Sequence, residues 1–310
     1  MRELRVEEND ANQRLDKFLQ KCLVDLPKSL MHKYIRNKKI KVNHKRCEAS
    51  QKLQVGDVVV CYIAESFFER SEDLRFLQAQ QPLRIVYEDQ NILVMHKAIG
   101  TLCHSDDLED IETLINQMKL YLYQQQAFDP KLEQSFTPAL CNRLDRNSEG
   151  LVIGAKQASA LREVNQLIKH HQLHKYYYAV VEGILQKDDI DLWHYHRRGD
   201  KIVVIQDTQK EGYKKVGLHY WIKKQMSHTA LVEIELYTGR THQIRAQFAH
   251  MHHPLVADYK YGAQKKANTY HALCAYKVVF EAPPSSPLAY LNAQSISIEQ
   301  DNIDLLRKLK

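Results

Sequence analysis

The stretch NRLDRNSEG, from Asn142 to Gly150, contains the residues of this chain whose spacing most directly indicates chemistry. Its carboxylate, Asp145, lies between Arg143 and Arg146. Nearby guanidinium groups favour the charged form of a carboxylate, so we expect Asp145 to be ionised at neutral pH. An ionised Asp suits a nucleophile or a general base rather than a general acid. An isolated string of this kind is more often a structural ion pair, so other motifs have to decide between the two.

A second stretch, YTGRTHQIRAQFAH, is dense in polar side chains: Arg240, Thr241, His242, Gln243 and Arg245. A helix that begins near Thr241 would place Arg245 on the same face as Thr241. The free N–H groups at the start of a helix also bind phosphate. The pattern predicts a nucleotide site, and the alternative is a capped amphipathic helix with an exposed polar end.

Three successive tyrosines, Tyr176, Tyr177 and Tyr178, alternate along the predicted strand KYYYAVVEG. Alternation sends at least one ring out of the core, where it can stack on a base. The alternative is that tyrosines simply favour strands.

Other common site types find little support. The chain has no G-x-x-x-x-G-K-[ST] loop, no G-x-G-x-x-G and only ten glycines, so we expect no cofactor. His250 and His253 in HMHHP are three residues apart, with Asp258 nearby, but no cysteine or acid has ligand spacing with them. We therefore expect helix-end packing or RNA contact there, and no metal site.

Residues 1–64 are predicted to form a small unit of two helices followed by strands. An apolar stripe runs through QRLDKFLQKCL, Pro27 ends that helix, and Ser29 begins the next. KIKVN and VGDVVVCYI then alternate as strands. A basic run without any acid follows the second helix into the first strand, which favours a phosphate-contacting face over a solvated surface. Its members are Lys28, Lys33, Arg36, Lys38, Lys39, Lys41, Lys45 and Arg46.

The rest of the chain is predicted to be a linker over 65–82 and a larger domain over 83–310. In the larger domain many strands alternate with a few helices, which is typical of an α+β fold with a mixed, largely antiparallel sheet. The net charge of +6 favours a polyanionic partner. The chain has six scattered cysteines without a C-x-x-C pair, no apolar leader and no apolar run of membrane-spanning length. We therefore expect a soluble, cytoplasmic protein.

These motifs together resemble the RluA-type pseudouridine synthases. NRLDRNSEGLVIGAK is similar to the catalytic motif H-R-L-D-x-x-T-S-G-L, and TGRTHQIRAQFAHMHHPLVADYKYG resembles the second signature of the family. EDQNILVMHKAIGTLCH, KYYYAVVEG and HALCAYKVVF resemble further core segments, and QRLDKFL…MHKYIRNKKIKVN resembles an S4-like RNA-binding domain, here a small α/β unit. Asn142, Ala98 and Glu149 depart from the commoner His, Pro and Ser of these motifs.

The resemblance implies a role for each matching residue. Asp145 would be the catalytic carboxylate, Arg245 would pair with it, and Tyr177 would stack on the target uracil. Substrate-binding positions would be Arg143, Leu144, Arg240, Thr241, His242, Gln243 and Leu273.

The activity implied is the isomerisation of specific uridines in structured RNA to pseudouridine, after base flipping and without a cofactor. We expect the protein to be a monomer. Asp145 would either attack C1′ of the ribose or remove a sugar proton. Large-subunit ribosomal RNA is the expected substrate, with tRNA as the alternative. A non-catalytic RNA-binding or ribosome-assembly factor is a competing class. A glycoside-cleaving enzyme ranks last, because it would need a second carboxylate.

Overall fold

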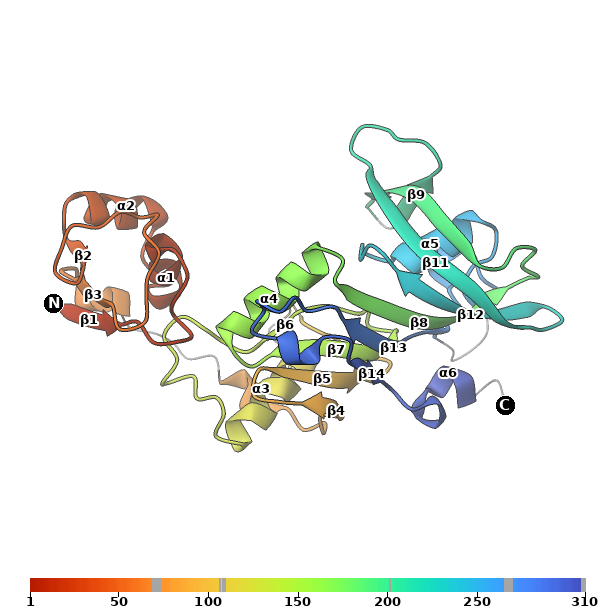
Figure 1. Cartoon of the computed structure of the whole chain (residues 1–310), viewed down its shortest axis with the longest axis horizontal. Coiled ribbons are helices and arrows are strands. Elements are labelled where there is room, and N and C mark those ends of the chain that lie inside the picture. The colour runs from red at the N-terminus through yellow and green to blue at the C-terminus, as the bar shows by residue number, and fades with distance from the viewer. Residues whose placement is uncertain (69–73, 106, 108–109, 201, 265–269, 308–310) are drawn as a thin grey trace.

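The computed structural model describes residues 1–310 except 69–73, 106, 108–109, 201, 265–269 and 308–310. Figure 1 shows a small N-terminal unit beside a much larger sheet that carries the remaining helices. Within the described residues there is no helix with both the length and the apolar character required to cross a membrane.

The N-terminal unit packs two helices on a three-stranded antiparallel sheet, in the strand order β1-β3-β2. Phe18 and Leu19 are fully buried in a core that this unit forms largely from its own residues. Burial of this stripe explains why the apolar spacing of the sequence produces a helix here. The elements are β1 (Arg2–Arg5), α1 (Leu15–Cys22), α2 (Lys28–Arg36), β2 (Ile40–Val42) and β3 (Val58–Cys61).

The second sheet has eleven strands and runs in the order β10-β9-β11-β12-β8-β13-β7-β5-β4, with β14 added to β13 and β6 added to β7. Within the described residues β13 and β7 are parallel, and the other paired strands are antiparallel. The predicted mixed, largely antiparallel sheet is therefore confirmed. The strands are β4 (Ile85–Glu88), β5 (Ile92–Lys97), β6 (Ala139–Leu140), β7 (Glu149–Ala155), β8 (Leu173–Glu182), β9 (Ile190–Arg198), β10 (Val203–Gln206), β11 (Lys214–Gln225), β12 (Thr229–Leu236), β13 (Leu273–Phe280) and β14 (Ser295–Ser297).

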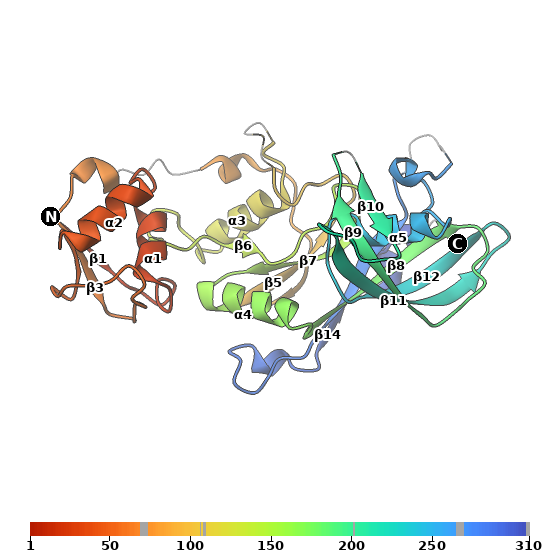
Figure 2. The same ribbon diagram turned by 90° about the horizontal axis from the view of Figure 1, so that it is seen from above.

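In the described residues, four α-helices accompany this sheet: α3 (Leu114–Gln124), α4 (Ala158–Lys169), α5 (Gln243–His250) and α6 (Asp304–Arg307). Met118 of α3 packs with β5 and β7, Val164 of α4 packs with β7 and β8, and Phe248 of α5 packs with β8, β11 and β12. Figure 2 shows α3 and α4 near the N-terminal unit and α5 near β8 to β11.

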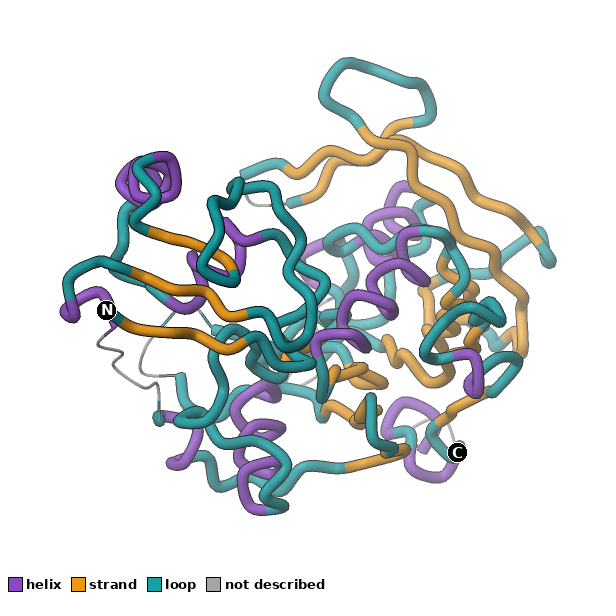
Figure 3. The backbone as a smooth tube through the Cα atoms, turned by 60° about the vertical axis from the view of Figure 1, so that its left-hand side comes forward, coloured by secondary structure: helices purple, strands orange, loops and turns teal. Residues whose placement is uncertain are grey.

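Polar contacts join the two units. Ser135 Oγ donates to Asp10 Oδ1 at 2.5 Å and accepts from Gln13 Nε2 at 2.8 Å. Asn9 Oδ1 accepts the backbone N–H of Ala158 at 3.0 Å and so caps the first turn of α4. In Figure 3 the N-terminal sheet comes forward and adjoins the body of the molecule.

Several boundaries differ from the sequence-based expectation. The predicted helix near Thr241 begins at Gln243, because His242 adopts a left-handed conformation with φ 53°. The shared-face argument for Thr241 and Arg245 was therefore wrong. The region 65–82 contains two 3-10 helices, Glu65–Phe68 and Arg75–Gln78, while 69–73 lie outside the described residues. Of the predicted terminal helix the structure describes Asp304–Arg307, and residues 308–310 lie outside the described part.

Candidate active site

Asp145 lies in the loop between β6 and β7, with a side chain that is 27% exposed. The backbone of this loop is fixed on both sides of the carboxylate. Leu144 N–H donates to Cys103 Sγ at 3.3 Å, and Ser148 N–H donates to the carbonyl of Asp145 at 3.0 Å. The loop therefore presents a partly accessible acid on an ordered backbone.

Arg245, in the first turns of α5, bridges two carboxylates. Its Nη1 lies 2.7 Å from Asp145 Oδ2, while its Nε and Nη2 lie 2.7 and 2.8 Å from the two oxygens of Asp258. Burial lowers the pKa of Arg245, but the hydrogen bonds and charges of Asp258 and Asp145 outweigh this effect and raise it. The guanidinium is therefore charged, and Asp145 accepts a charge-assisted hydrogen bond.

His242 and Tyr261 complete the surroundings of this ion pair. His242 Nε2 lies 3.7 Å from Asp145 Oδ2, and its Nδ1 lies 2.9 Å from the Tyr261 hydroxyl. The Arg245 guanidinium is 5.1 Å from the centre of the Tyr261 ring. Burial lowers the pKa of His242, so the ring is neutral at pH 7. Its left-handed backbone turns the side chain towards Asp145 just before the helix begins.

A cavity of about 600 Å³ opens beside Asp145. Tyr177 of β8 and Leu273 of β13 line it and are 7% and 8% exposed. Burial, followed by the charge of Asp145, raises the pKa of Tyr177, so its hydroxyl keeps its proton. Every substrate-site residue predicted from the sequence lines the cavity: Arg143, Leu144, Asp145, Tyr177, Arg240, Thr241, His242, Gln243, Arg245 and Leu273.

Four further cations line the same cavity: Arg143, Lys175, Arg198 and Arg240. None of the four forms an ion pair with an acid in the described part of the chain. Burial lowers the pKa of Lys175, which lies close enough to Gly239 that an added Cβ there would sit 3.4 Å from its Nζ. The cavity therefore combines one anchored carboxylate with an excess of positive charge, which suits an anionic ligand.

Gln243 has a different setting from that of its neighbours. Its Nε2 donates to the carbonyl of Gly217 at 3.0 Å and to Gln247 Oε1 at 2.9 Å. Its Oε1 accepts from Thr238 Oγ1 and from the backbone N–H of Arg240. With its polar atoms engaged in this way, Gln243 supports the loop at the cavity mouth rather than offering groups to a ligand.

Buried polar pairs hold the loops around Asp145. Lys97 is fully buried and donates to the carbonyls of Ala98, Thr101 and Arg146 at 2.9–3.0 Å, and burial lowers its pKa to about 8. Ser148 Oγ lies 2.8 Å from His271 Nε2. These contacts tie the Asp145 loop to the segment after β5 and to the start of β13.

Glu149, where the resembled motif has Ser, has structural partners. Its Oε1 lies 3.0 Å from His96 Nε2, and its two oxygens lie 3.3 and 3.2 Å from the N–H of Asp304. The departure at this position thus replaces a small hydroxyl with a buried acid that holds the start of α6.

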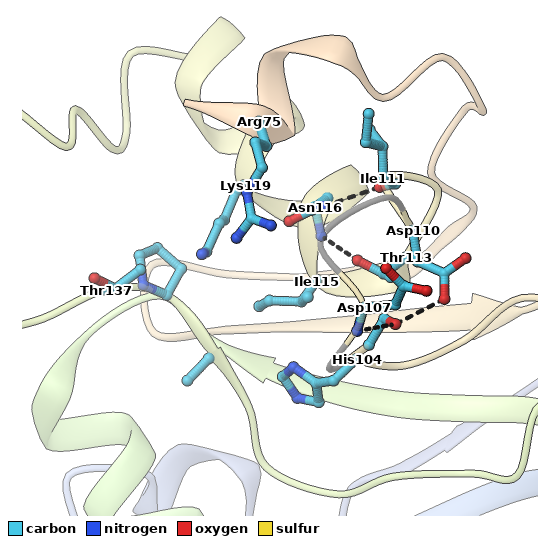
Figure 4. A pocket seen from close by; sticks show the side chains of 13 residues that line it. Arg75, His104, Asp107, Asp110, Ile111, Thr113, Ile115, Asn116, Lys119 and Thr137 are labelled. Atoms are coloured by element: carbon cyan, nitrogen blue, oxygen red, sulfur yellow. Dashed lines mark hydrogen bonds between the residues drawn. The ribbon is translucent and has the colours of Figure 1, made fainter. Parts of the chain in front are cut away.

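A second cavity, of about 300 Å³, lies beside the first and shares His104 with it. Figure 4 shows the hydrogen bonds that order its wall. Thr113 Oγ1 accepts from the N–H of Asn116 at 3.4 Å and so caps α3, and Asn116 Nδ2 donates to the carbonyl of Ile111 at 2.9 Å. Ser105 Oγ donates to Asp110 at 2.7 Å. His104, at the start of this segment, lies in the wall of both cavities.

The histidine cluster of the sequence is divided in space. His253 Nδ1 bonds the carbonyl of Glu182, and Asp258 bonds Arg245. His250 instead lies with His194 and Asp207, and their ligand atoms are within 4.8 Å of one another. Gln247 Nε2 lies 3.0 Å from His194 Nδ1 and is oriented by the bond from Gln243, so Nε2 of neutral His194 carries the proton. In this arrangement His194 takes part in a hydrogen-bond chain that runs from Gln243 through Gln247.

The comparisons with known proteins decide the family. Residues 91–250 match the family model described as RNA pseudouridylate synthase, and residues 13–59 match the S4 domain. The chain belongs to the RNA pseudouridylate synthase family. It is an RNA pseudouridine synthase with an N-terminal S4 domain, as the sequence motifs predicted.

Relatives of this synthase include proteins that it matches over nearly their whole length. It is 32% identical over 298 residues to an uncharacterized RNA pseudouridine synthase of Mycoplasma capricolum, covering 94% of this chain and 95% of that protein. It is 31% identical to the ribosomal large subunit pseudouridine synthase C of Buchnera aphidicola subsp. Schizaphis graminum, with coverage of 83% and 79%.

A solved structure shares the fold of the synthase. Human RNA pseudouridylate synthase domain containing 1 superposes with a TM-score of 0.53 at 22% identity, over 73% of this chain and 94% of that chain. At this identity the likeness concerns the fold alone.

Sequence reasoning missed several residues of the site. Asp258 was considered only as a neighbour of the histidines, and Lys175, Arg198 and Cys103 were given no role. The spacing K-x-Y places Lys175 on the same side of a strand as Tyr177, which was a usable signal. No local pattern marks Arg198, because β9 reaches the cavity through tertiary contacts: its pairing with β11 and the contact of His196 Nε2 with the carbonyl of Thr241 at 3.0 Å.

Proposed function

We propose that this synthase isomerises specific uridines of large-subunit ribosomal RNA, with Asp145 as the catalytic carboxylate. The observation that carries the proposal is Asp145, held by Arg245 at the edge of a cavity that is lined by Tyr177 and by cations without an ion-pair partner among the described residues. A flipped nucleotide brings a flat base, a sugar and flanking phosphates, and the cavity has a group suited to each.

The reaction exchanges one bond of the sugar for another. The C1′–N1 bond of uridine breaks, the ring turns, and C1′ bonds to C5. The hydrogen of C5 then leaves as a proton, and N1 gains one, so atoms and electrons balance without an external oxidant or reductant. Asp145 either attacks C1′ or removes a sugar proton, and both routes need an ionised carboxylate beside the ribose.

The remaining residues have supporting roles in this proposal. Arg245 orients Asp145 through its hydrogen bond, and Tyr177 offers its ring to the uracil as the base turns. Extrusion of the base costs about a few kcal/mol, which stacking and phosphate contacts offset. Arg143, Arg240 and Thr241 lie at the exposed mouth, where they can bind phosphates.

The RNA target is inferred from the relatives and from the S4 unit. Relatives that match most of the chain are named ribosomal large subunit pseudouridine synthases. The basic run of the S4 unit supports RNA contact. Seven of its eight members are exposed and Lys41 is half-buried, and none forms an ion pair with an acid in the described part of the chain. We further propose domain boundaries of 1–64 and 83–310 with a linker over 65–82, in keeping with the separate core of the N-terminal unit.

The test is tritium release from [5-³H]uridine in a large-subunit ribosomal RNA transcript. The wild type should release tritium, and Asp145→Asn should lower the single-turnover rate by at least about 10³-fold while it binds the same RNA with similar affinity. Asp25→Asn, at an exposed acid outside the cavity, is the matched control. A clearly active Asp145→Asn variant would overturn the assignment. Release from a tRNA transcript alone would favour the alternative substrate.

A further inference from the structure

An exposed tryptophan lies on the outer face of strands β9 and β11. Residues alternate along β9, so that His194 and His196 are buried while Trp193 is 45% exposed. Trp193 pairs directly with Gly217 of β11. A Cβ added at Gly217 would lie 2.3 Å from the indole ring, so the ring occupies the space that the absent side chain leaves. The absence of a side chain at Gly217 thus allows the Trp193 ring to pack against a solvent-exposed face of the sheet.

Cations and other aromatic rings surround this indole. Lys215 Nζ lies 4.5 Å from the centre of the Trp193 ring, and the Tyr237 ring is 5.7 Å away at an angle of 30°. Four residues after Trp193 on β9, the Arg197 guanidinium lies 5.0 Å from the ring of Tyr213, which directly precedes β11. We call these five residues, with Tyr195, the aromatic platform: Trp193, Tyr195, Arg197, Tyr213, Lys215 and Tyr237.

The charge of the platform favours an anionic partner. Arg197 and Lys215 are exposed, and neither forms an ion pair with an acid in the part of the chain that the structure describes. The nearby Asp191 is already bound by His219 Nδ1 at 2.9 Å and by the Tyr237 hydroxyl at 2.9 Å. Exposed rings interleaved with cations are the arrangement by which proteins bind single-stranded nucleic acid, with bases on the rings and phosphates on the cations.

The platform adjoins the loop that lines the catalytic cavity. Tyr237 is followed directly by Thr238 and by the cavity residues from Gly239 to His242. The carbonyl of Gly217 accepts from Gln243 Nε2, which supports the same loop. Residues 238–242 therefore connect the platform directly to the cavity mouth.

We propose that the aromatic platform binds a single-stranded segment of the RNA substrate outside the catalytic cavity, by stacking bases on Trp193 and pairing phosphates with Lys215 and Arg197. The proposal rests on the proposed function for its choice of RNA. It adds a second contact area on the catalytic sheet, separate from the S4 unit.

Intrinsic fluorescence gives a direct test, because the chain has two tryptophans, Trp193 and Trp221. In the full-length Trp221→Phe variant Trp193 is the sole indole. Titration with a twelve-residue oligouridylate should quench its emission to saturation. The Trp193→Phe variant, which retains Trp221, is the matched control and should show no comparable quenching. Absence of quenching in Trp221→Phe, or equal quenching by a twelve-base-pair RNA duplex, would overturn the proposal.

Two substitutions test the geometry while the fluorophore remains. Gly217→Ala in the Trp221→Phe background should displace the indole and weaken oligouridylate binding about tenfold. Lys215→Ala should reduce the salt slope of binding by about 0.7. Unchanged affinity in both variants would contradict the proposed contacts.

The catalytic readout separates this proposal from the proposed function. Trp193→Ala should raise KM for a long ribosomal RNA transcript about tenfold with kcat nearly unchanged, since the platform lies outside the cavity. Quenching should persist in Asp145→Asn. If the wild type is inactive but its fluorescence is still quenched by the oligouridylate, the proposed function is wrong and the proposed RNA contact of the platform is retained.

Discussion

Asp258 holds Arg245 through two hydrogen bonds of 2.7 and 2.8 Å, and this buried pair directs the remaining guanidinium nitrogen to Asp145. Asp258 is 2% exposed, so it cannot itself contact RNA. Its contribution is to compensate the charge of Arg245 in the interior and to fix the plane of the fork. Asp258 thus positions Asp145 through Arg245, which lies thirteen residues before Asp258 in the chain.

We predict that Asp258→Asn lowers kcat by about 100-fold with a smaller change in KM, because Arg245 loses the bidentate partner that orients it. The same variant should lose about 3 kcal/mol of unfolding free energy, since a buried cation is left partly uncompensated. Single-turnover tritium release and urea denaturation measure the two effects. Arg245→Lys is the companion variant, because it keeps the charge without the fork and should also be slow. Wild-type kcat in Asp258→Asn would show that the anchor is dispensable.

Lys175 is expected to bind an anionic part of the flipped nucleotide, because it lines the cavity with Tyr177 and has no acidic partner among the residues that the structure describes. Lys175→Met should lower kcat/KM by about 30-fold, and Lys175→Arg should recover part of the loss because a cation returns. Steady-state tritium release at several RNA concentrations gives both parameters. The exposed Lys187→Met serves as the control for loss of one positive charge. Equal activity of Lys175→Met and the control would remove Lys175 from the site.

The basic run of the S4 unit should govern the salt dependence of RNA binding. Replacement of Lys33, Arg36 and Lys39 by alanine should make the slope of log K against log salt shallower by about 2–3, because each phosphate contact releases counterions. Filter binding of a ribosomal RNA transcript over a series of salt concentrations measures it. All three side chains are exposed, so the fold should remain intact. If the slope is the same as that of the wild type, the run is only a solubilising surface.

His271 should make the folded state sensitive to acid. Burial lowers its pKa to about 4, below the ordinary value of 6.5. Between these values the unfolded chain binds the proton and the native chain does not, so stability rises with pH through this window and falls on acidification. Between pH 7 and 4.5, the unfolding free energy of the wild type should fall by on the order of 2 kcal/mol more than the unfolding free energy of His271→Gln. Urea denaturation at a series of pH values checks this, and parallel curves for the two proteins would contradict it.

The order of elements was accessible from the sequence because apolar periodicity reports burial locally. The strands around Tyr177 and Leu273 and the two N-terminal helices follow from such patterns. β9 was not predicted, since Ile190–Arg198 is rich in aromatic, histidine and charged residues and has no clear alternation of apolar with polar residues. These residues form a strand because they pair with β11 and β10, and local propensity does not predict such pairing.

The sequence by itself determined the family, the identity of the central acid and the basic bias of the N-terminal unit, because these depend on residue types at short spacing. Tertiary structure decided which charges meet. Arg143 and Arg146 adjoin Asp145 in the chain, yet Arg245, one hundred positions away, takes the hydrogen bond. The physical reason is directional: a loop sends neighbouring side chains apart, whereas α5, packed on the sheet and anchored through Asp258, brings a guanidinium to the carboxylate at bonding distance.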